Sequence, residues 1–393
     1  MLAAGLALLA LAVRWPRLWT VPRFTDETLE VLHSLAIVRD GTRPLTNYDS
    51  YYGALYNYVV ALALLVSGES PLAPRVVVLL AGALTVLATY FLGVRIAGRL
   101  GMRGVASRLT GLLAGGLLAV NGPHVVVNSH IAWSNCLTPL LTTLAFWALA
   151  GGAFWALAGG AFWALVGGAM NRAPTRAGAV GARFIAPSAG VGLTMAGLVL
   201  GLALQTHPLV VVLLPGIALG LLMREWRIVR TPWPWLAAGA FLVGYANVLV
   251  YNAEHGFESL RSAQRIQAEY AQDQQAASGY LPTAGSMLVL LVRILGGAAD
   301  QRESVAAYLA DPGALSVCAL AAAGLGLLAW RRELVPLLAC LSFLAILPAA
   351  NPKFQTLLTT RYLMPIVPLL LCCASLTLVW LAELARTRWL TAR

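Results

Sequence analysis

Two adjacent acidic residues, Asp26 and Glu27, are the clearest candidates for chemistry in a sequence with only 16 acidic residues among 393. A carboxylate beside an apolar segment can accept a proton from a hydroxyl group or help to hold a divalent cation. The same residues are favoured in the first turn of a helix, where Thr25 or Asp26 would cap the N-terminus. Both interpretations are open, and they are compatible with each other.

Candidate contacts for an anionic ligand lie far along the chain. Arg361 and Lys353 come just before a C-terminal apolar segment, where an arginine could bind a phosphate through two hydrogen bonds or snorkel to the membrane interface. Tyr362 could donate a hydrogen bond to the same ligand or belong to an aromatic belt. His207, which precedes Pro208, is either a polar ligand contact or a histidine that hydrogen-bonds carbonyl groups freed by the proline.

A divalent metal cation is a candidate cofactor, but the sequence does not define its ligands. Glu254 and His255 are neighbouring candidate metal ligands in a polar region, but they match no recognised zinc spacing. The five cysteines lie in or beside apolar segments and are not spaced as disulfides or metal sites, so we interpret them as small packing residues.

The elements that position these residues are expected to be membrane helices. Hydrophobic residues make up 59% of the chain and charged residues 11%, whereas a soluble domain has about a quarter charged residues. The apolar segments are continuous, without period-two alternation, and most reach the roughly 20 residues that a spanning helix needs. The net charge of +11 comes from arginines clustered between these segments. This arrangement is the positive-inside pattern, which favours membrane lipids over nucleic acid as partners.

These arginine clusters predict an all-α, polytopic membrane protein with about ten transmembrane helices and both termini in the cytoplasm, in the plasma membrane. Residues 1–393 form one domain in this interpretation, with no soluble domain after the last helix. Two outer regions, 23–74 and 252–312, contain interfacial helices, including Gly53–Val66. The expected transmembrane helices are about 2–22, 75–95, 109–127, 135–160, 190–204, 209–223, 233–251, 313–330, 334–349 and 362–382.

A repeat of three eight-residue units occupies Ala145–Gly168. Eight residues turn an α-helix by about 800°, so successive copies do not share one helix face. We interpret the repeat as a duplicated extension of the helix that contains it.

Four motifs occur in an order that resembles the GT-C glycosyltransferases, and more narrowly the branch of protein O-mannosyltransferases and lipid A aminoarabinose transferases. The resemblance covers most of residues 10–380. The motifs are Asp26-Glu27 with Asn47–Gly53 about twenty residues later, Gly68–Arg75 before a long helix, Gly201–Pro208 with Leu213-Leu214-Pro215, and Arg361–Pro368.

The resemblance implies transfer of a sugar from a polyprenyl phosphate to a hydroxyl acceptor on a protein, lipid or glycan, at the outer face of the membrane. It assigns the role of base to Asp26, with Glu27 beside it, and an attack opposite the phosphate would invert the anomeric centre. Some relatives place a lysine before prolines where this chain has Tyr51 and Tyr52. The phosphate contacts expected here are therefore Arg361, Lys353, Tyr362 and His207, with Tyr52 near the donor.

Two other functions remain open at this point. A transporter or lipid flippase would place its polar site near the middle of the bilayer, on broken helices. Charged residues are nearly absent from the centres of the predicted helices, and polar residues gather on one side, which favours an enzyme. A catalytically lapsed relative is the third possibility, because the lysine of some relatives is missing.

Overall fold

The computed structural model describes residues 2–16, 18–20, 25–151, 187–273, 279–299, 307, 309–351, 354 and 358–391. Throughout this part of the chain the regular elements are helices, and one isolated bridge pairs Thr46 with Gly53. The prediction of an all-α fold is confirmed. The α-helices are α1 (Leu2–Arg14), α2 (Thr25–Arg39), α3 (Leu55–Ser67), α4 (Ala73–Arg99), α5 (Val105–Ala119), α6 (Gly122–Ser129), α7 (Thr138–Leu149), α9 (Pro187–Thr206), α10 (Leu214–Arg224), α11 (Trp233–Gly244), α12 (Ala246–Glu254), α13 (Glu258–Asp273), α14 (Tyr280–Leu295), α16 (Pro312–Trp330), α17 (Leu334–Ala350) and α18 (Val367–Thr391). The short 3-10 helices are η1 (Ser134–Leu137), η2 (Pro208–Leu213), η3 (Trp226–Arg230) and η4 (Leu358–Tyr362).

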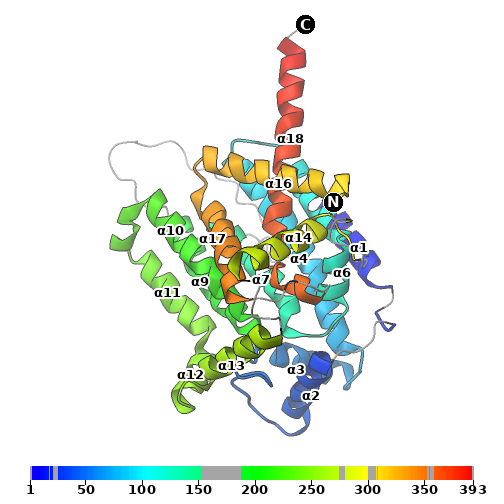
Figure 1. The fold of residues 1–393 in the computed structure, drawn as a ribbon, viewed down its shortest axis with the longest axis vertical. Helices are drawn as coiled ribbons and strands as arrows, with labels where there is room; N and C mark the ends of the chain where they lie inside the picture. Colours follow the sequence, from blue (N-terminus) through cyan, green and yellow to red (C-terminus); the bar gives the residue numbers. More distant parts are fainter. Residues whose placement is uncertain are drawn as a thin grey trace, which may run out of the picture.

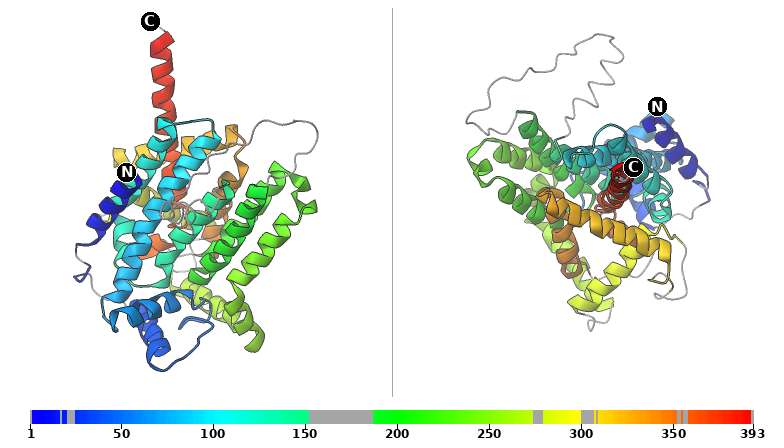
Figure 2. Two further views of the ribbon diagram at one scale, coloured as in Figure 1. Left: turned by 180° about the vertical axis from the view of Figure 1, so that it is seen from behind. Right: turned by 90° about the horizontal axis from the view of Figure 1, so that it is seen from above.

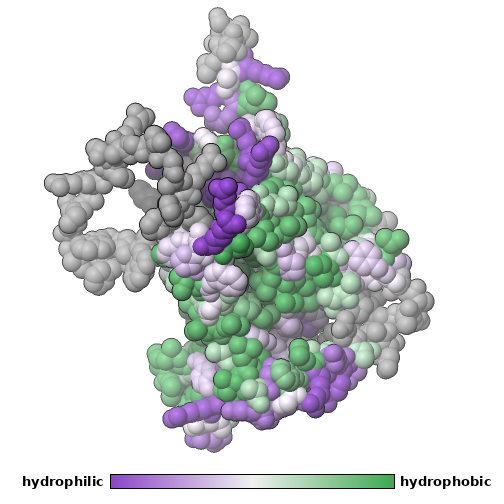
Figure 3. Space-filling model, turned by 90° about the vertical axis from the view of Figure 1, so that its left-hand side faces the viewer, coloured by the Kyte–Doolittle hydropathy of each residue, from purple (hydrophilic) through white to green (hydrophobic). Residues whose placement is uncertain are grey.

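Membrane-spanning helices are present, as the composition predicts. Within the described residues, three helices, α4, α16 and α18, are each long and apolar enough to cross a membrane, and the number is five if each of two bent helix pairs is one span. Most other expected spans are shorter apolar helices, including α9, α10 and α17. Figure 3 shows a broad hydrophobic surface across the middle of the molecule, with hydrophilic side chains gathered towards its two ends. The chain is therefore an integral membrane protein.

The first helix is shorter than predicted. The sequence predicts a helix over about 2–22, but α1 ends at Arg14 and residues 18–20 form a turn. Pro16 explains the early end, because a proline disfavours the helical conformation of the residue before it and cannot donate a backbone hydrogen bond.

Two helices predicted as continuous are each broken by a sharp bend. The predicted helix 109–127 is α5 and α6, which meet at 64°, and the predicted helix 233–251 is α11 and α12, which meet at 65°. At the first bend Asn121 accepts a 3.0 Å hydrogen bond from the His124 backbone N–H and so caps α6. Pro123 in the first turn of α6 fits this new start, since its missing N–H would interrupt a continuous helix.

Much of the predicted fourth helix lies outside the described residues. The segment 135–160 begins with η1 and α7, which ends at Leu149. Most of the repeat over Ala145–Gly168 belongs to the residues that are not described, and its interpretation stays a prediction.

The described helices form a bundle with a layer of short helices at one end. In Figures 1 and 2 the helices α2, α3, α12 and α13 lie together at the lower end, and α4 runs from this layer to the opposite end. The interfacial segment predicted over Gly53–Val66 is α3, and the apolar helix α14 lies within the predicted region 252–312. The final turns of α18 extend beyond the bundle at the opposite end, where residues 381–389 are exposed.

Candidate functional site

The two residues of the acidic pair have different surroundings. Consecutive residues of a helix are rotated by about 100°, so Asp26 and Glu27 leave the first turn of α2 in different directions. Glu27 is 3% exposed and accepts hydrogen bonds of 2.8 and 3.1 Å from Arg75 at the start of α4. Arg75 also donates to the carbonyl oxygen of Leu18, at 2.6 Å. Glu27 thus anchors α2 to α4, while the side chain of Asp26 is 47% exposed.

Arg361 lies at ion-pair distance from Asp26 in the candidate site. Its Nη1 lies 3.9 Å from Oδ2 of Asp26, which is an ion-pair distance but too long for a hydrogen bond. The guanidinium lies over the ring of Trp133, 4.5 Å from its centre, and donates to the Tyr362 hydroxyl at 3.1 Å. Its Nε is buried and has no hydrogen-bond partner among the described residues. Arg361 can therefore donate further hydrogen bonds to an anionic ligand.

Glu30 fixes the position of the segment that contains Trp133, through hydrogen bonds with the next residue, Ser134. Its buried carboxyl group accepts hydrogen bonds from the backbone N–H and the hydroxyl of Ser134, at 2.8 and 3.1 Å. Burial raises the pKa of Glu30 from 4.5 to about 8, against the lowering effect of hydrogen bonds from Asn47 and Ser134. No sequence motif marks Glu30 as a site residue, although it lies one helical turn after Asp26. Because Trp133 precedes Ser134, Glu30 connects α2 to the ring under Arg361.

His207 lies in the turn between α9 and η2, with its ring between two tyrosines. The ring centres of Tyr52 and Tyr362 are 5.9 and 5.6 Å away, and both contacts are edge-to-face. Nδ1 of His207 accepts a 3.1 Å hydrogen bond from the Leu209 backbone N–H, so we assign the proton to Nε2. Nε2 is buried and has no partner among the described residues. Burial, together with the charge of Arg361, lowers the pKa of His207 to about 3, so the imidazole is a neutral donor at pH 7.

A tight turn brings Tyr52 next to His207. The backbone N–H of Gly53 donates to the carbonyl oxygen of Gln205, at 2.8 Å. A side chain at this position would not fit, because a Cβ on Gly53 would lie 2.6 Å from Oε1 of Gln205. The Asn47 N–H bonds the Tyr52 carbonyl at 3.0 Å and closes the loop. The glycine therefore allows the loop to pack directly on the end of α9.

These aromatic residues border a cavity of about 210 Å³. One side is polar and aromatic, with Tyr51, Tyr52, His207 and Tyr362, while the remaining lining is mainly apolar. The apolar part comes mostly from η2 and α13, through Leu209, Val211, Val212, Ala263 and Ile266. A cavity with one polar and one apolar side suits an amphiphile whose head binds beside Arg361.

The structure brings together five of the residues selected from the sequence, namely Asp26, Arg361, Tyr362, His207 and Tyr52. Glu27 is directed to Arg75 instead. Lys353 lies outside the described residues, so its predicted role stays a prediction.

The candidate metal ligands do not form a metal cluster within the described residues. Glu254 is exposed at the end of α12, and the exposed His255 stacks on Tyr251 with ring centres 4.2 Å apart. No group of three or more His, Cys, Asp or Glu side chains that could hold a metal ion occurs in the described part of the chain.

Several residues of the site could not be identified from their spacing in the sequence. Trp133 is more than two hundred residues from Arg361 in sequence, and Ser134 is 104 residues from Glu30. For Arg75 the sequence indicates only a position at the end of the motif Gly68–Arg75, before a long helix. Such contacts depend on helix packing, not on local pattern.

Comparison with known proteins gives one informative result. No protein-family model matches the chain, and no curated protein sequence matches it significantly. Among solved structures, the chain is similar to the crystal structure of ArnT from Cupriavidus metallidurans bound to undecaprenyl phosphate, with a TM-score of 0.58 and 13% sequence identity. The match covers 99% of this chain and 62% of the ArnT chain. The resemblance indicated by the motifs is thus confirmed for the fold: over nearly its whole length, this chain is similar in fold to ArnT, a lipid A aminoarabinose transferase of the GT-C type.

Proposed function

We propose that this protein is a membrane glycosyltransferase that moves a sugar from a polyprenyl phosphate to a hydroxyl acceptor, with Asp26 as the base. The observation that carries the proposal is the pairing of opposite charges beside the cavity. The half-exposed carboxylate of Asp26 lies 3.9 Å from the mostly buried guanidinium of Arg361, which in turn contacts Tyr362 in the cavity wall. A base and a cation for the leaving phosphate are the two groups that this reaction needs.

The donor we propose is an amphiphile. Its phosphate binds Arg361, with Nε2–H of His207 and the hydroxyls of Tyr52 and Tyr362 as further donors, and Lys353 as a further predicted contact. Its prenyl chain follows the apolar lining formed by η2 and α13. The ArnT crystal structure, to which this fold is similar, contains undecaprenyl phosphate, which supports this choice of donor class.

The proposed chemistry is a single displacement. Asp26 removes the proton from the acceptor hydroxyl as its oxygen forms a bond to the anomeric carbon of the sugar. The bond between that carbon and the phosphate oxygen breaks, and its electron pair stays on the phosphate, whose growing charge Arg361 stabilises. Attack opposite the leaving phosphate inverts the anomeric centre. Glu27 supports Asp26 from the buried side through its hydrogen bonds to Arg75.

We further propose that the site faces the outside of the plasma membrane, with about ten crossings and both termini in the cytoplasm. Arginine clusters predicted to be cytoplasmic support this orientation, because Arg99 and Arg224 line one pocket with Glu333. Figure 1 places the ends of α4 and α10, which carry Arg99 and Arg224, and the turn from α16 to α17, which carries Glu333, away from the layer of α2 and α3. The positive-inside rule assigns such an end to the cytoplasm.

A transporter or flippase is the second candidate function, favoured by one observation. The bends between α5 and α6 and between α11 and α12 are broken helices of the kind that transporters use. However, the polar groups described above gather at one end of the bundle, beside a layer of interfacial helices. This arrangement suits chemistry at a surface more than passage through the bilayer.

The test is sugar transfer from a panel of polyprenyl-phosphate sugars, by purified wild-type protein and by the Asp26→Asn variant. We expect one donor to be turned over by wild type and at least about 100-fold more slowly by the variant, with unchanged thermal unfolding. Parallel reactions with added magnesium or a chelator test the predicted divalent cation. Movement of an intact polyprenyl-phosphate sugar across vesicles without sugar transfer would instead favour the flippase. No turnover and no movement of any donor would favour a lapsed enzyme.

A further inference from the structure

A second charged site lies at the end of the bundle opposite the candidate active site. Arg95 and Arg99 occupy the last turns of α4, and Arg103 follows in the turn to α5. They line an open groove of about 580 Å³ between α4, α5 and α7. We call this the basic groove and define it by Arg95, Arg99, Arg103, Ser107, Phe91 and Trp147.

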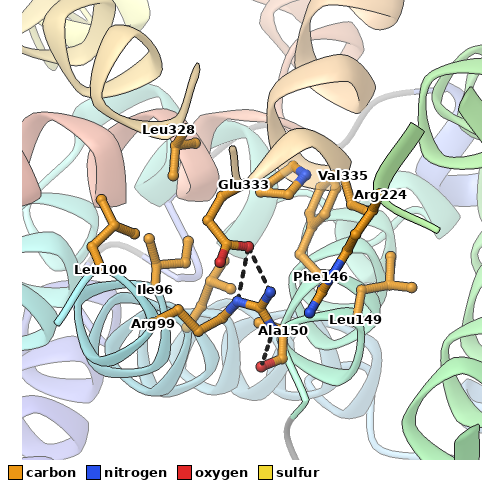
Figure 4. Close-up of a pocket in the computed structure, with 12 residues that line it drawn as sticks. Ile96, Arg99, Leu100, Phe146, Leu149, Ala150, Arg224, Leu328, Glu333 and Val335 are labelled. Atoms are coloured by element: carbon orange, nitrogen blue, oxygen red, sulfur yellow. Dashed lines mark hydrogen bonds and ion pairs between the residues drawn. The ribbon is translucent and has the colours of Figure 1, made fainter. Parts of the chain in front are cut away.

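The charges around this groove are unbalanced. Arg99 is paired with Glu333, whose Oε2 lies 2.6 Å from Nη2 and 2.9 Å from Nε. Figure 4 shows Arg224 reaching from α10 into the pocket behind this pair. Among the described residues that line the groove and the pocket, four arginines (Arg95, Arg99, Arg103 and Arg224) face one carboxylate, that of Glu333, for a net charge of +3. An anionic ligand would neutralise part of this positive charge.

Arg95 and Arg99 already have hydrogen-bond partners within the protein. Arg95 donates from Nε to the carbonyl oxygen of Ala150 at 3.0 Å, and its Nη2 donates to Gly151. These carbonyl groups lie at the C-terminal end of α7 and do not neutralise the full charge of Arg95. Arg95 therefore keeps its attraction for a phosphate while losing little side-chain entropy on binding.

The start of α5 adds a further attraction for anions. Gly104 caps this helix without a side-chain hydrogen bond and also lines the groove. The N-terminus of a 15-residue helix carries a partial positive charge and backbone N–H groups that can bind phosphate oxygens. The helix end and the arginines thus point to the same ligand chemistry.

The groove also has an apolar part, which identifies the source of the phosphate. Phe91, Val94, Met102 and Trp147 line it together with the arginines. Phe91 lies one helical turn before Arg95, towards the middle of α4. A free phosphate ion would not contact this apolar surface favourably, whereas a phospholipid has acyl chains next to its headgroup phosphate.

We propose that the basic groove binds the phosphate of an anionic phospholipid. Its headgroup phosphate contacts Arg95, Arg99 and Arg103, and its acyl chains lie along Phe91 and Trp147. Basic pockets between membrane helices on the cytoplasmic side are typical binding sites for anionic headgroups, and the positive-inside rule assigns this end to the cytoplasm. The proposal is independent of the glycosyltransferase reaction, which uses the opposite end of the bundle.

The experiment measures binding of phosphatidylglycerol and phosphatidylcholine to the delipidated full chain in detergent, by native mass spectrometry over a lipid titration. The variants are Arg103→Gln and the double variant Arg95→Gln/Arg103→Gln. Arg108→Gln is the matched control, since Arg108 is exposed at the same end in the first turn of α5 but does not line the groove. Arg103 is also exposed, so its replacement should leave folding intact even where the double variant fails to fold.

We expect wild type to bind phosphatidylglycerol more tightly than phosphatidylcholine. Arg103→Gln should weaken phosphatidylglycerol binding about fivefold, the double variant should weaken it further, and Arg108→Gln should leave it unchanged. Equal binding of the two lipids would overturn the proposal. An equal loss with Arg108→Gln would also overturn it, because any surface arginine would then suffice. Displacement of phosphatidylglycerol by millimolar inorganic phosphate would also overturn the proposal and would show that the groove is a site for free phosphate.

Discussion

Arg75 donates two hydrogen bonds, of 2.8 and 3.1 Å, to the buried carboxylate of Glu27. This pair joins the first turns of α2 and α4 and so fixes the position of the neighbouring Asp26. The adjacent acids therefore divide their roles: Glu27 is a positioning residue, and Asp26 remains available beside Arg361.

The first prediction separates these two roles. Asp26→Asn should reduce sugar transfer by at least about 100-fold with little change in unfolding temperature, because the side chain is half exposed. Glu27→Gln removes the countercharge of a buried arginine and should cost about 3–5 kcal/mol of stability. Thermal unfolding and turnover of both variants provide the check. A stable Glu27→Gln protein with full activity would contradict the anchoring role.

Arg361→Lys tests whether the planar guanidinium matters beyond its charge. Lysine keeps the positive charge but loses stacking on Trp133 and the fork of donors that suits a phosphate. We expect a rate loss of roughly tenfold, corresponding to about 1.4 kcal/mol. Steady-state turnover of the donor is the measurement, and Arg386→Lys, on the exposed end of α18, is the control. Equal turnover by Arg361→Lys and wild type would show that charge alone suffices.

His207→Phe tests the proposed hydrogen bond from Nε2. Phenylalanine keeps a ring that can contact Tyr52 and Tyr362 edge-to-face, but it removes both the Nε2 donor and the Nδ1 acceptor of the Leu209 N–H. The KM for the donor should rise about five- to tenfold, since one hydrogen bond to a charged group contributes about 1.5–3 kcal/mol before losses from rearrangement. An unchanged KM would mean that the donor does not contact His207. Because the imidazole is neutral, its pKa being lowered to about 3, the wild-type KM should show no histidine titration between pH 5 and 8.

The raised pKa of Glu30 predicts that the stability of the protein depends on pH. Its pKa is about 8 in the folded protein, raised mainly by burial from its usual value of 4.5. Below pH 4.5 the carboxyl group is protonated in both the folded and the unfolded state. Between pH 4.5 and 8 only the unfolded state releases the proton, so the free energy of unfolding falls as the pH rises.

The matched variant for this effect is Glu30→Gln, which has no proton to release. Unfolding temperatures of wild type and variant, measured from pH 4.5 to 8.5, should diverge across this interval, with the steeper fall in wild type. Parallel curves would contradict the raised pKa.

A pair of glycines in α5 tests helix packing. A Cβ on Gly111 would meet the carbonyl oxygen of Tyr90 in α4, whereas a Cβ on Gly116 would have no atom within 4 Å. Gly111→Ala should therefore destabilise the protein by about 1–3 kcal/mol, while Gly116→Ala should be neutral or slightly stabilising. Thermal unfolding of the two variants is the measurement, and equal unfolding temperatures would contradict the close packing of α4 and α5.

The sequence by itself determined the class of the fold. Continuous apolar segments require helices, because a lipid environment leaves backbone groups no other partners, and the motifs identified the GT-C resemblance. Residue type and position indicate four of the site residues, Asp26, Arg361, Tyr362 and His207, while the GT-C resemblance implies the role of Asp26 as base and adds Tyr52. Apolar content did not predict where helices bend or end early. Pro16 lacks a backbone N–H donor and Asn121 caps α6, and a hydropathy average over many residues does not detect such local effects.

Only the tertiary structure decided which charges meet. In sequence Asp26 and Glu27 are equivalent candidates, but packing of α2 on α4 pairs Glu27 with Arg75 and leaves Asp26 near Arg361. Packing likewise placed Trp133 under Arg361 and buried Glu30 against Ser134. The physical reason is that a carboxylate's role follows from its solvation and its partners, and helix packing sets both by joining residues distant in sequence.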